Sequence, residues 1–499
     1  MQNDLALCFC TAHTTRSCIV IKIPTGRPCQ SSTLLGVSHS TGLLASSSVN
    51  MFSMILSERV ILAEFLSMFP SLANFRICLQ VVSMEQPTGE KVLFVSAMVL
   101  AVFLLVTALL IALVSILYIP LPDGICDRLK LQFVEFLLRV SNEYFGRVIG
   151  TIFGPSVWNK LTRLVVAIAF LFKSRSPRWV TVKNELIGAT RVRVYYPAER
   201  KTNSLIIFIH GGGWAIMRPG HYDNVIYMLI ARLGILVISI DYRLSPESPY
   251  PEPVNECEAV FHRLVNGEHE RFDIDPRRIC VMGDSAGGNL STVVAQRQLR
   301  KKLPSPKCQV LIYPVIHSFD LKSPSYQIYY KQLCGTSLLN PRLMARWYLL
   351  YLGIPATPAN IEKFLANRHL RRKDSERLQE LISHELLPAE FSEDYSEKQA
   401  DPPPDDDLCR LFNKNGFDPD FAPILGKDLF GLPPAMIVTA GYDILRDEGA
   451  LYAKRLQSFN VPVQWNHYPA AYHGVINMPS SMQRNQILDD IAHYLDMNL

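Results

Sequence analysis

The stretch Arg278-Ile-Cys-Val-Met-Gly-Asp-Ser-Ala-Gly-Gly-Asn289 decides the fold. Its first half is a short apolar run typical of a buried strand, and a helical pattern continues from Ala286 toward Arg300. A strand, a tight turn and a helix around Gly-x-Ser-x-Gly make a nucleophile elbow, in which the glycines remove side chains that would collide. We favour this interpretation over a glycine-rich structural turn. The elbow would consist of Gly283, Asp284, Ser285 and Gly287, with Ser285 as the nucleophile.

Upstream, His210-Gly-Gly-Gly-Trp214 directly follows the predicted strand 205–210. Consecutive glycines let backbone N–H groups face a ligand, as in an oxyanion hole. We expect the amides of Gly211 and Gly212 to act with that of Ala286. A phosphate-binding loop is excluded because neither GK[ST] nor GxGxxG accompanies the glycines. The candidate oxyanion-hole residues are His210, Gly211, Gly212, Gly213 and Ala286.

Two further residues complete a candidate catalytic triad. Asp443 follows a predicted strand within Thr439-Ala-Gly-Tyr-Asp-Ile-Leu-Arg-Asp-Glu448, and His473 lies after the next strand. The order Ser, Asp, His along the chain is the one that this arrangement requires. His473 would move protons to and from Ser285, and Asp443 would hold its tautomer. The competing candidates are Asp447 and His467.

Short β-branched runs alternate with helical patterns from Trp179 onward. Such alternation predicts an α/β fold with a mostly parallel central sheet flanked by helices. The predicted strands are 205–210, 235–242, 279–283, 310–314, 435–440 and 463–468. An insertion at about 315–430, interpreted as part lid and part solvated loop, interrupts a catalytic domain that spans 179–499.

The block Ser239-Ile-Asp-Tyr-Arg-Leu-Ser-Pro-Glu247 closes one of these strands beside the predicted glycine loop. We interpret it as a structural brace of that loop through hydrogen bonds. Asn289-Leu-Ser291 matches the glycosylation sequon, but it lies in the helix behind Ser285. We expect that helix to be buried and the asparagine to be unmodified.

The N-terminal part contains an uncharged apolar run. Residues 92–119 are long enough for the roughly 20 residues of a bilayer-spanning helix, and we interpret them as a transmembrane signal anchor. Residues 1–83 form an extension that is either disordered or upstream of an alternative start at Met84. Residues 123–178 are predicted cap or membrane-proximal helices. The few flanking basic residues weakly favour a cytosolic C-terminal part.

Composition narrows the function classes. The chain has 499 residues, with 48% hydrophobic and 19% charged residues, which suits a large globular domain with an apolar addition. A formal net charge of +5 without a long basic run gives no indication of nucleic-acid binding. The eleven cysteines include no CxxC pair, and the CxC of Cys8 and Cys10 is a poor metal motif. We therefore expect no metal, no cofactor and no nucleic-acid partner.

Taken together, the motifs HGGGW, DYRLSPE, GDSAGGN, YDILRDEG and YHG resemble the hormone-sensitive-lipase family of α/β-hydrolases. The apolar anchor followed by Tyr118-Ile-Pro-Leu-Pro122 is similar to the membrane-bound branch with arylacetamide deacetylases and neutral cholesterol ester hydrolase. The resemblance implies a helical cap and a single-pass type II protein of the endoplasmic reticulum membrane with a lumenal catalytic domain. It also implies action on hydrophobic lipid, acylglycerol, sterol or aryl esters, with the bilayer as partner.

Several functions remain open at this point. The leading hypothesis is a serine hydrolase that cleaves carboxylic esters through an acyl-enzyme. An amidase or deacetylase would use the same residues to release an amine as the leaving group. An acyltransferase would transfer the acyl group to an alcohol in place of water. From another class, the chain would be a membrane scaffold that keeps the fold without activity.

Overall fold

The computed structural model describes residues 89–139, 146–170, 176–333, 339–393, 395 and 401–499. The expectations for the extension 1–83, for Met84 and for Cys8 and Cys10 lie outside the described residues. The chain divides into two units, Met1–Val99 and Leu100–Leu499. The first is described only from Gly89 onward, and the second contains the sheet discussed below.

An eight-stranded sheet forms the centre of the described second unit, in the order β1-β2-β4-β3-β5-β6-β7-β8. Antiparallel pairs join β1 to β2 and β2 to β4, and the remaining neighbours are parallel, so the predicted mostly parallel sheet is confirmed. The strands are β1 (Val180–Ile187), β2 (Thr190–Pro197), β3 (Leu205–Ile209), β4 (Leu236–Asp241), β5 (Ile279–Asp284), β6 (Cys308–Ile312), β7 (Ala435–Tyr442) and β8 (Val463–Tyr472).

The six predicted strands are all present, and the hairpin of β1 and β2 is an addition. Every residue of β3, β5 and β6 is buried, which matches the continuous apolar runs typical of a parallel sheet covered on both faces. In β1 only the two end residues, Val180 and Ile187, are buried. Because the middle of β1 is polar, a search for continuous apolar runs in the sequence does not detect this edge strand.

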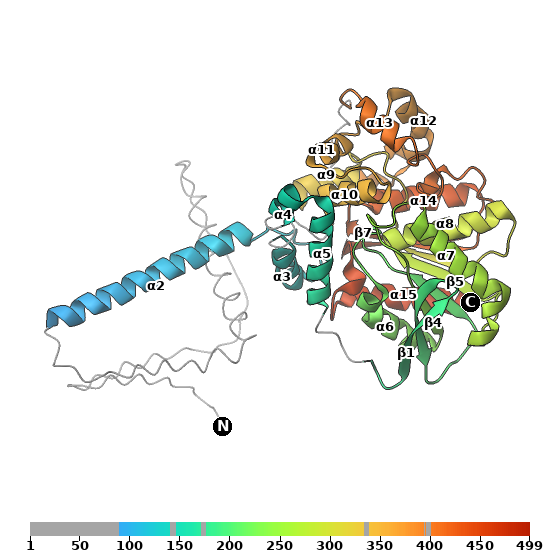
Figure 1. Cartoon of the computed structure of the whole chain (residues 1–499), viewed down its shortest axis with the longest axis horizontal. Helices are drawn as coiled ribbons and strands as arrows, with labels where there is room; N and C mark the ends of the chain where they lie inside the picture. The colour runs from blue at the N-terminus through green and yellow to red at the C-terminus, as the bar shows by residue number, and fades with distance from the viewer. Residues whose placement is uncertain (1–88, 140–145, 171–175, 334–338, 394, 396–400) are drawn as a thin grey trace, which may run out of the picture. The chain divides into compact units, whose positions relative to one another are not determined.

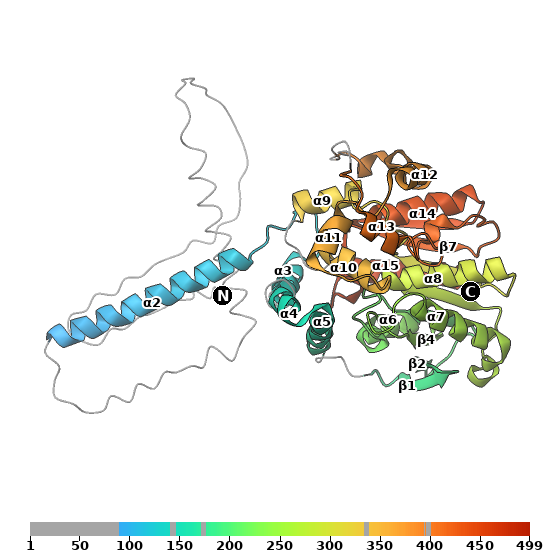
Figure 2. The same cartoon turned by 45° about the horizontal axis from the view of Figure 1, so that its top comes forward.

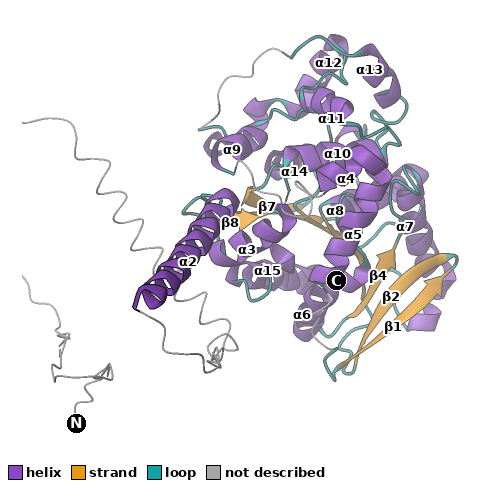
Figure 3. Cartoon of the chain, turned by 60° about the vertical axis from the view of Figure 1, so that its left-hand side comes forward, coloured by secondary structure: helices purple, strands orange, loops and turns teal. Residues whose placement is uncertain are grey.

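Helices cover both faces of this sheet. Helix α6 (Asp223–Leu233) contacts α15 (Met482–Asn498), and α7 (Glu252–Arg263) contacts α8 (Ala286–Lys301). Figure 3 shows the sheet between these two pairs. Helix α14 (Arg446–Ser458) packs on β7 and β8. The strand ends that carry Ser285, Asp443 and His473 therefore lie at one edge of a rigid scaffold.

The insertion after β6 is helical and largely packed. It contains α9 (Pro324–Gln332), α10 (Pro341–Tyr351), α11 (Pro358–Leu365), α12 (Arg372–Ile382) and α13 (Asp406–Phe412), which lie together in Figure 1. A Cβ added at Gly213 would meet the Trp347 ring at 2.2 Å, so α10 packs directly on the glycine loop. This part of the chain therefore covers the candidate oxyanion loop; the sequence predicted an insertion that is part lid and part solvated loop.

Within the described residues, four helices precede the sheet: α2 (Gly89–Leu117), α3 (Arg128–Leu138), α4 (Gly146–Phe153) and α5 (Pro155–Ala169). Among the described helices, α2 alone is long and apolar enough to cross a membrane, over Leu93–Ser115. None of the most apolar stretch of Leu93–Ser115 is buried inside the described structure. Helices α3, α4 and α5 lie close together (Figure 2).

Candidate active site

Ser285 occupies a strained turn between β5 and α8. Its backbone has φ 55° and ψ −120°, a conformation that persists only where the surroundings enforce it. A Cβ added at Gly287 would lie 1.9 Å from the carbonyl oxygen of Ile209, and one at Gly283 would lie 2.3 Å from that of Gly287. Both glycines are required because backbone fills the space of their missing side chains. The turn holds the Ser285 hydroxyl at the end of the sheet.

The three predicted triad side chains lie in hydrogen-bond contact. The Nε2 atom of His473 lies 3.0 Å from the Ser285 Oγ, and its Nδ1 atom lies 2.8 Å from Asp443 Oδ2. The other Asp443 oxygen accepts the backbone N–H of Leu445 at 2.9 Å. Asp443 and His473 directly follow β7 and β8, whose pairing brings them together although 30 residues separate them.

The two competing residues have other partners. Asp447 is buried and accepts the Ser325 backbone N–H at 2.7 Å, at the start of α9, and it forms an ion pair with Arg446. His467 lies within β8, with its Nδ1 atom 2.9 Å from the Thr439 hydroxyl. Within the described residues, neither is hydrogen-bonded to Ser285 or His473.

In the glycine loop after β3, one of the backbone N–H groups expected to face the oxyanion has another partner. The N–H of Gly211 donates to Asp284 Oδ1 at 2.8 Å and also approaches the Tyr222 hydroxyl at 3.1 Å. This amide is therefore already used, which corrects the expectation that it faces the oxyanion. Within the described residues, no hydrogen bond recorded for the loop or elbow uses the amides of Gly212, Gly213 or Ala286. Positive φ angles of 94° and 57° at Gly212 and Gly213 turn the loop.

His210 supports the loop from below. Its ring is fully buried and stacks on Tyr242 with a centroid separation of 4.2 Å. Burial lowers the pKa of this imidazole to about 3, so the ring is neutral. The Tyr242 hydroxyl donates to the His210 carbonyl at 2.8 Å. The predicted bracing role of the 239–247 block is confirmed by this bond.

Asp284 is a second brace, and the sequence analysis had placed it only in the elbow. Its other oxygen accepts the Tyr222 hydroxyl at 2.9 Å, so one carboxylate joins the elbow, the glycine loop and the residues before α6. Burial raises the pKa of this carboxyl to about 6, although the bonds from Tyr222 and Gly211 oppose the rise.

Glu448 is a buried acid that the sequence analysis did not single out. It lies near the start of α14, and its Oε2 atom accepts the backbone N–H groups of Ile316 and His317 at 2.7 and 3.0 Å. Burial raises the pKa of Glu448 to about 8. The carboxyl therefore fixes the segment that follows β6. Its signal in the sequence is the acidic end of the YDILRDEG motif.

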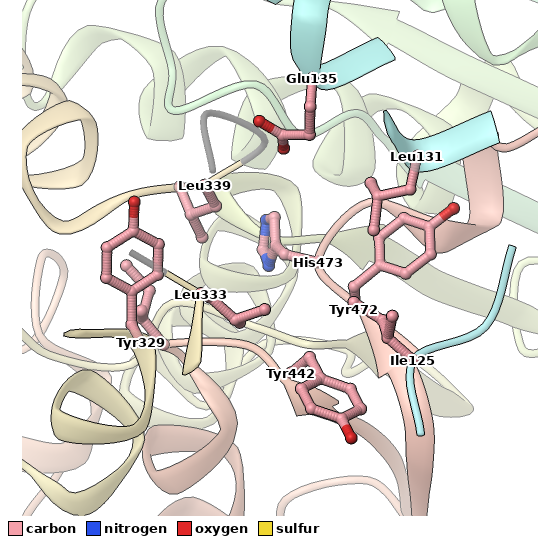
Figure 4. A pocket seen from close by; sticks show the side chains of 10 residues that line it. Ile125, Leu131, Glu135, Tyr329, Leu333, Leu339, Tyr442, Tyr472 and His473 are labelled. Atoms are coloured by element: carbon pink, nitrogen blue, oxygen red, sulfur yellow. The ribbon is translucent and has the colours of Figure 1, made fainter. Parts of the chain in front are cut away.

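A small pocket lies beside His473. Figure 4 shows His473 between Leu131 and Tyr472 on one side and Tyr329 and Leu339 on the other. The lining is mostly apolar, and α3 contributes to it together with the segments around β7, β8 and α9. The lining residues are Ile125, Leu131, Glu135, Tyr329, Leu333, Leu339, Tyr442, Ile444, Tyr472 and His473. The space next to the imidazole therefore suits an apolar group.

Comparison with known proteins places this geometry in a family. Residues 206–382 and 396–477 match a family described as having the alpha/beta hydrolase fold. Arylacetamide deacetylase of Rattus norvegicus is 32% identical over 419 residues, covering 80% of this chain and 99% of that protein. Neutral cholesterol ester hydrolase 1 of the same organism is 30% identical over 421 residues, with 79% and 98% covered.

Solved structures agree on the fold. A thermostable esterase from Pseudomonas putida superposes with a TM-score of 0.51 at 24% identity, over 68% of this chain and 90% of that one. An arylesterase gives the same TM-score of 0.51 at 22% identity, over 76% and 100%. The family match and the relatives aligned over nearly their whole length identify the family as well as the fold. The chain belongs to the hormone-sensitive-lipase family of α/β-hydrolases and is a serine ester hydrolase.

Proposed function

We propose that this chain is a membrane-anchored hydrolase that cleaves hydrophobic carboxylic esters through an acyl-enzyme on Ser285. The supporting observation is the continuous contact from the Ser285 Oγ to His473 at 3.0 Å and from His473 to Asp443 at 2.8 Å. Lipid, acylglycerol, sterol and aryl esters are the proposed substrate classes, because the pocket beside His473 is mostly apolar.

In the first half-reaction, the Ser285 oxygen attacks the ester carbonyl while its proton passes to His473 Nε2. The carbonyl oxygen becomes an oxyanion, which the amides of Gly212, Gly213 and Ala286 stabilise. When the intermediate collapses, His473 gives this proton to the departing alcohol, and the acyl group remains on Ser285. Asp443 accepts a hydrogen bond from the Nδ1–H group of the imidazole throughout and stays ionised.

In the second half-reaction, water attacks the acyl-enzyme and gives a proton to His473. The second oxyanion uses the same three amides. Its collapse releases the carboxylic acid, and the proton on His473 returns to the Ser285 oxygen. The cycle needs no metal or cofactor for atoms and charges to balance.

The decisive test uses the full chain in membranes. We expect Ser285→Ala to lose both labelling by a fluorophosphonate probe and hydrolysis of a short p-nitrophenyl ester, by at least about 10³-fold, without loss of folded protein. The matched control is Ser291→Ala, which removes a buried hydroxyl from the same helix. Equal labelling of Ser285→Ala and wild type would contradict the proposal.

An amide substrate is the second candidate, supported by the relative that is named arylacetamide deacetylase. The geometry is the same, but His473 would have to protonate an amine leaving group. Parallel assays on an aryl acetate and the matching aryl acetamide separate the two. A ratio of kcat/KM values near one would favour the amide assignment, and a large excess for the acetate would favour the esterase.

We infer the location from the family resemblance and the apolar helix. Helix α2 would be a signal anchor in the endoplasmic reticulum membrane, with the hydrolase domain in the lumen. The support in this chain is the apolar window Leu93–Ser115. Its 23 residues exceed the roughly 20 that a spanning helix needs.

A further inference from the structure

Helix α5 is amphipathic in the reverse sense to a surface helix of a soluble protein. Its buried stripe contains the polar residues Asn159 and Thr162 together with Val166, and its exposed stripe contains Val157, Leu164 and Ile168. The Asn159 amide donates to the carbonyls of Ala215 and Ser245 at 3.3 Å each, so polar groups hold α5 on the domain. The apolar side chains of the opposite stripe are therefore exposed.

Helix α3 likewise buries a polar side chain and exposes apolar ones. Glu135 is fully buried and lies beside Leu131 in the wall of the pocket, while Phe133 on the opposite face is 56% exposed. Leu129 and Leu137 lie one turn to either side of Phe133 and are also exposed. Burying a carboxylic acid while exposing a phenyl ring is unfavourable for a helix that faces water.

Exposed apolar side chains concentrate in these helices. Outside α2, nine of the eighteen large exposed hydrophobic residues of the described chain fall between residues 129 and 168, with exposed fractions from 42% to 65%. An apolar surface of this kind marks an interaction site. We call it the α3–α5 face, made of Leu129, Phe133, Leu137, Val148, Ile152, Phe153, Val157, Leu164 and Ile168.

Charge identifies the partner. Residues 118–178 contain nine Lys and Arg residues and four Asp and Glu residues, so this segment carries an excess equal to the +5 of the whole chain. One of the four acids, Glu135, is buried in the pocket wall. Arg128, Lys130 and Arg163 form ion pairs with Asp123, Asp127 and Glu247, whereas Lys160 and Arg178 are exposed. Apolar side chains interspersed with basic ones are typical of helices that lie on anionic lipid surfaces.

The chain connection keeps this face near the bilayer. Only residues 118–127 join α2 to α3, which limits the separation of the two helices to about 35 Å. The connection is packed rather than loose, because Ile119, Leu121 and Ile125 are buried and the Cys126 N–H donates to the Ala470 carbonyl at 2.9 Å. Tyr118 is exposed at the end of α2, where an aromatic residue suits the headgroup region.

We propose that the α3–α5 face lies in the headgroup region of an anionic lipid bilayer, with its apolar side chains inserted among the acyl chains. This rests on the proposed membrane-anchored hydrolase. The new proposal specifies the surface that contacts the lipid, the charge of that lipid and a route by which substrate enters. Because α3 both faces the lipid through Phe133 and lines the pocket through Leu131, an ester dissolved in the bilayer reaches His473 past a wall one helix thick.

The test is photolabelling of the wild-type full chain in vesicles by a phospholipid with a diazirine in its acyl chain. In vesicles with an anionic phospholipid fraction, we expect labelled peptides from α2 and from residues 129–168. In purely phosphatidylcholine vesicles, or at high salt, labelling of 129–168 should fall at least about threefold while α2 labelling is unchanged.

The outcomes separate the two proposals. Labelling of α2 without labelling of 129–168 would overturn the α3–α5 face and leave the anchored hydrolase intact. Absence of label from α2 would instead contradict the proposal that α2 is a membrane anchor. Equal labelling of 129–168 in both kinds of vesicle would overturn the anionic preference.

Activity gives a second readout with a matched control. We expect Phe133→Glu/Phe153→Glu to lower hydrolysis of a long-chain ester dissolved in vesicles at least about fivefold, and to leave hydrolysis of a water-soluble short ester within about twofold. Phe430→Glu is the control, because Phe430 is 67% exposed on a loop before β7. Equal hydrolysis of the long-chain ester by the double variant and the control would contradict the proposal.

Discussion

At the scale of single residues, Asp443 and Asp447 show how position rather than residue type assigns a role. Asp443 contacts the Nδ1 atom of His473, whereas Asp447 holds the start of α9. We expect Asp443→Asn to lower kcat by about 10⁴-fold, because an amide N–H facing the imidazole favours the wrong tautomer.

Asp447→Asn is the matched control, because it removes the neighbouring carboxylate. It should lose thermal stability yet keep kcat per folded molecule within about tenfold. The measurement is the ester assay normalised by active-site titration with the fluorophosphonate probe. Near-normal turnover in Asp443→Asn together with collapse in Asp447→Asn would reassign the triad acid.

Glu448 predicts a pH dependence of stability. Its folded pKa of about 8 lies above the ordinary value of 4.5, so the folded state holds this proton more tightly than the unfolded state does. Its contribution to stability is therefore greatest below pH 4.5 and is lost as pH rises toward 8. A glutamine at this position cannot titrate, but its side-chain oxygen still accepts the two backbone N–H groups.

We expect Glu448→Gln to gain free energy of unfolding relative to wild type as pH rises from 5 to 8, by up to roughly 3 kcal/mol. Denaturant unfolding of both proteins across this range is the measurement. Glu258→Gln is the control, since salt bridges lower the pKa of that partly buried acid and leave it ionised throughout the range. A difference that stays constant with pH would show that Glu448 is ionised in the folded protein.

At the scale of elements, the contact between α8 and β3 decides whether the elbow forms. The Gly287 backbone lies so close to Ile209 that a Cβ would come within 1.9 Å of its carbonyl oxygen. Gly287→Ala should therefore push the helix away from the sheet, at a cost of about 3 kcal/mol or more, and should lose probe labelling. Thermal unfolding and labelling measure the two effects.

Ser291→Ala is again the control, because it lies one turn further along α8 and loses only a hydroxyl that bonds to the Gly287 carbonyl at 2.8 Å. We expect it to cost about 1 kcal/mol and to keep labelling. Wild-type stability in Gly287→Ala would mean that helix and sheet are packed less closely than the structure has them.

At the scale of the whole molecule, the proposed orientation in a membrane can be tested by glycosylation. The native sequon at Asn289 is buried, and its side chain donates to the carbonyls of Val315 and Phe421, so wild type should carry no glycan there. Asn415→Ser completes a sequon with Asn413, which is exposed after α13. For a lumenal domain, this variant should gain one endoglycosidase-sensitive mass shift.

Asn415→Ala, which creates no sequon, controls for the substitution itself. A cytosolic domain would leave all three proteins unshifted, as the weak bias of flanking basic residues suggests. Protease protection of the hydrolase domain in sealed microsomes provides an independent measurement of the same orientation.

The sequence by itself determined the sheet and the identity of the triad candidates. Five of the six predicted strands are largely continuous apolar runs, whereas β8 mixes apolar and polar residues. Ser285 was predictable because Gly283 and Gly287 flank it at the end of β5. These signals are local: they depend on residues adjacent in the chain, which the sequence displays directly. The hairpin of β1 and β2 was missed because its polar alternation lacks such a run.

Only the tertiary structure decided which of the available groups are used. It assigned the Gly211 amide to Asp284, paired Asp447 with α9 and buried Glu448 against the segment that follows β6. It also turned the apolar side of α5 outward, against the usual rule for a surface helix. Each of these depends on a partner far away in the chain, and hydrogen bonding and burial between distant segments have no periodicity that a sequence can reveal.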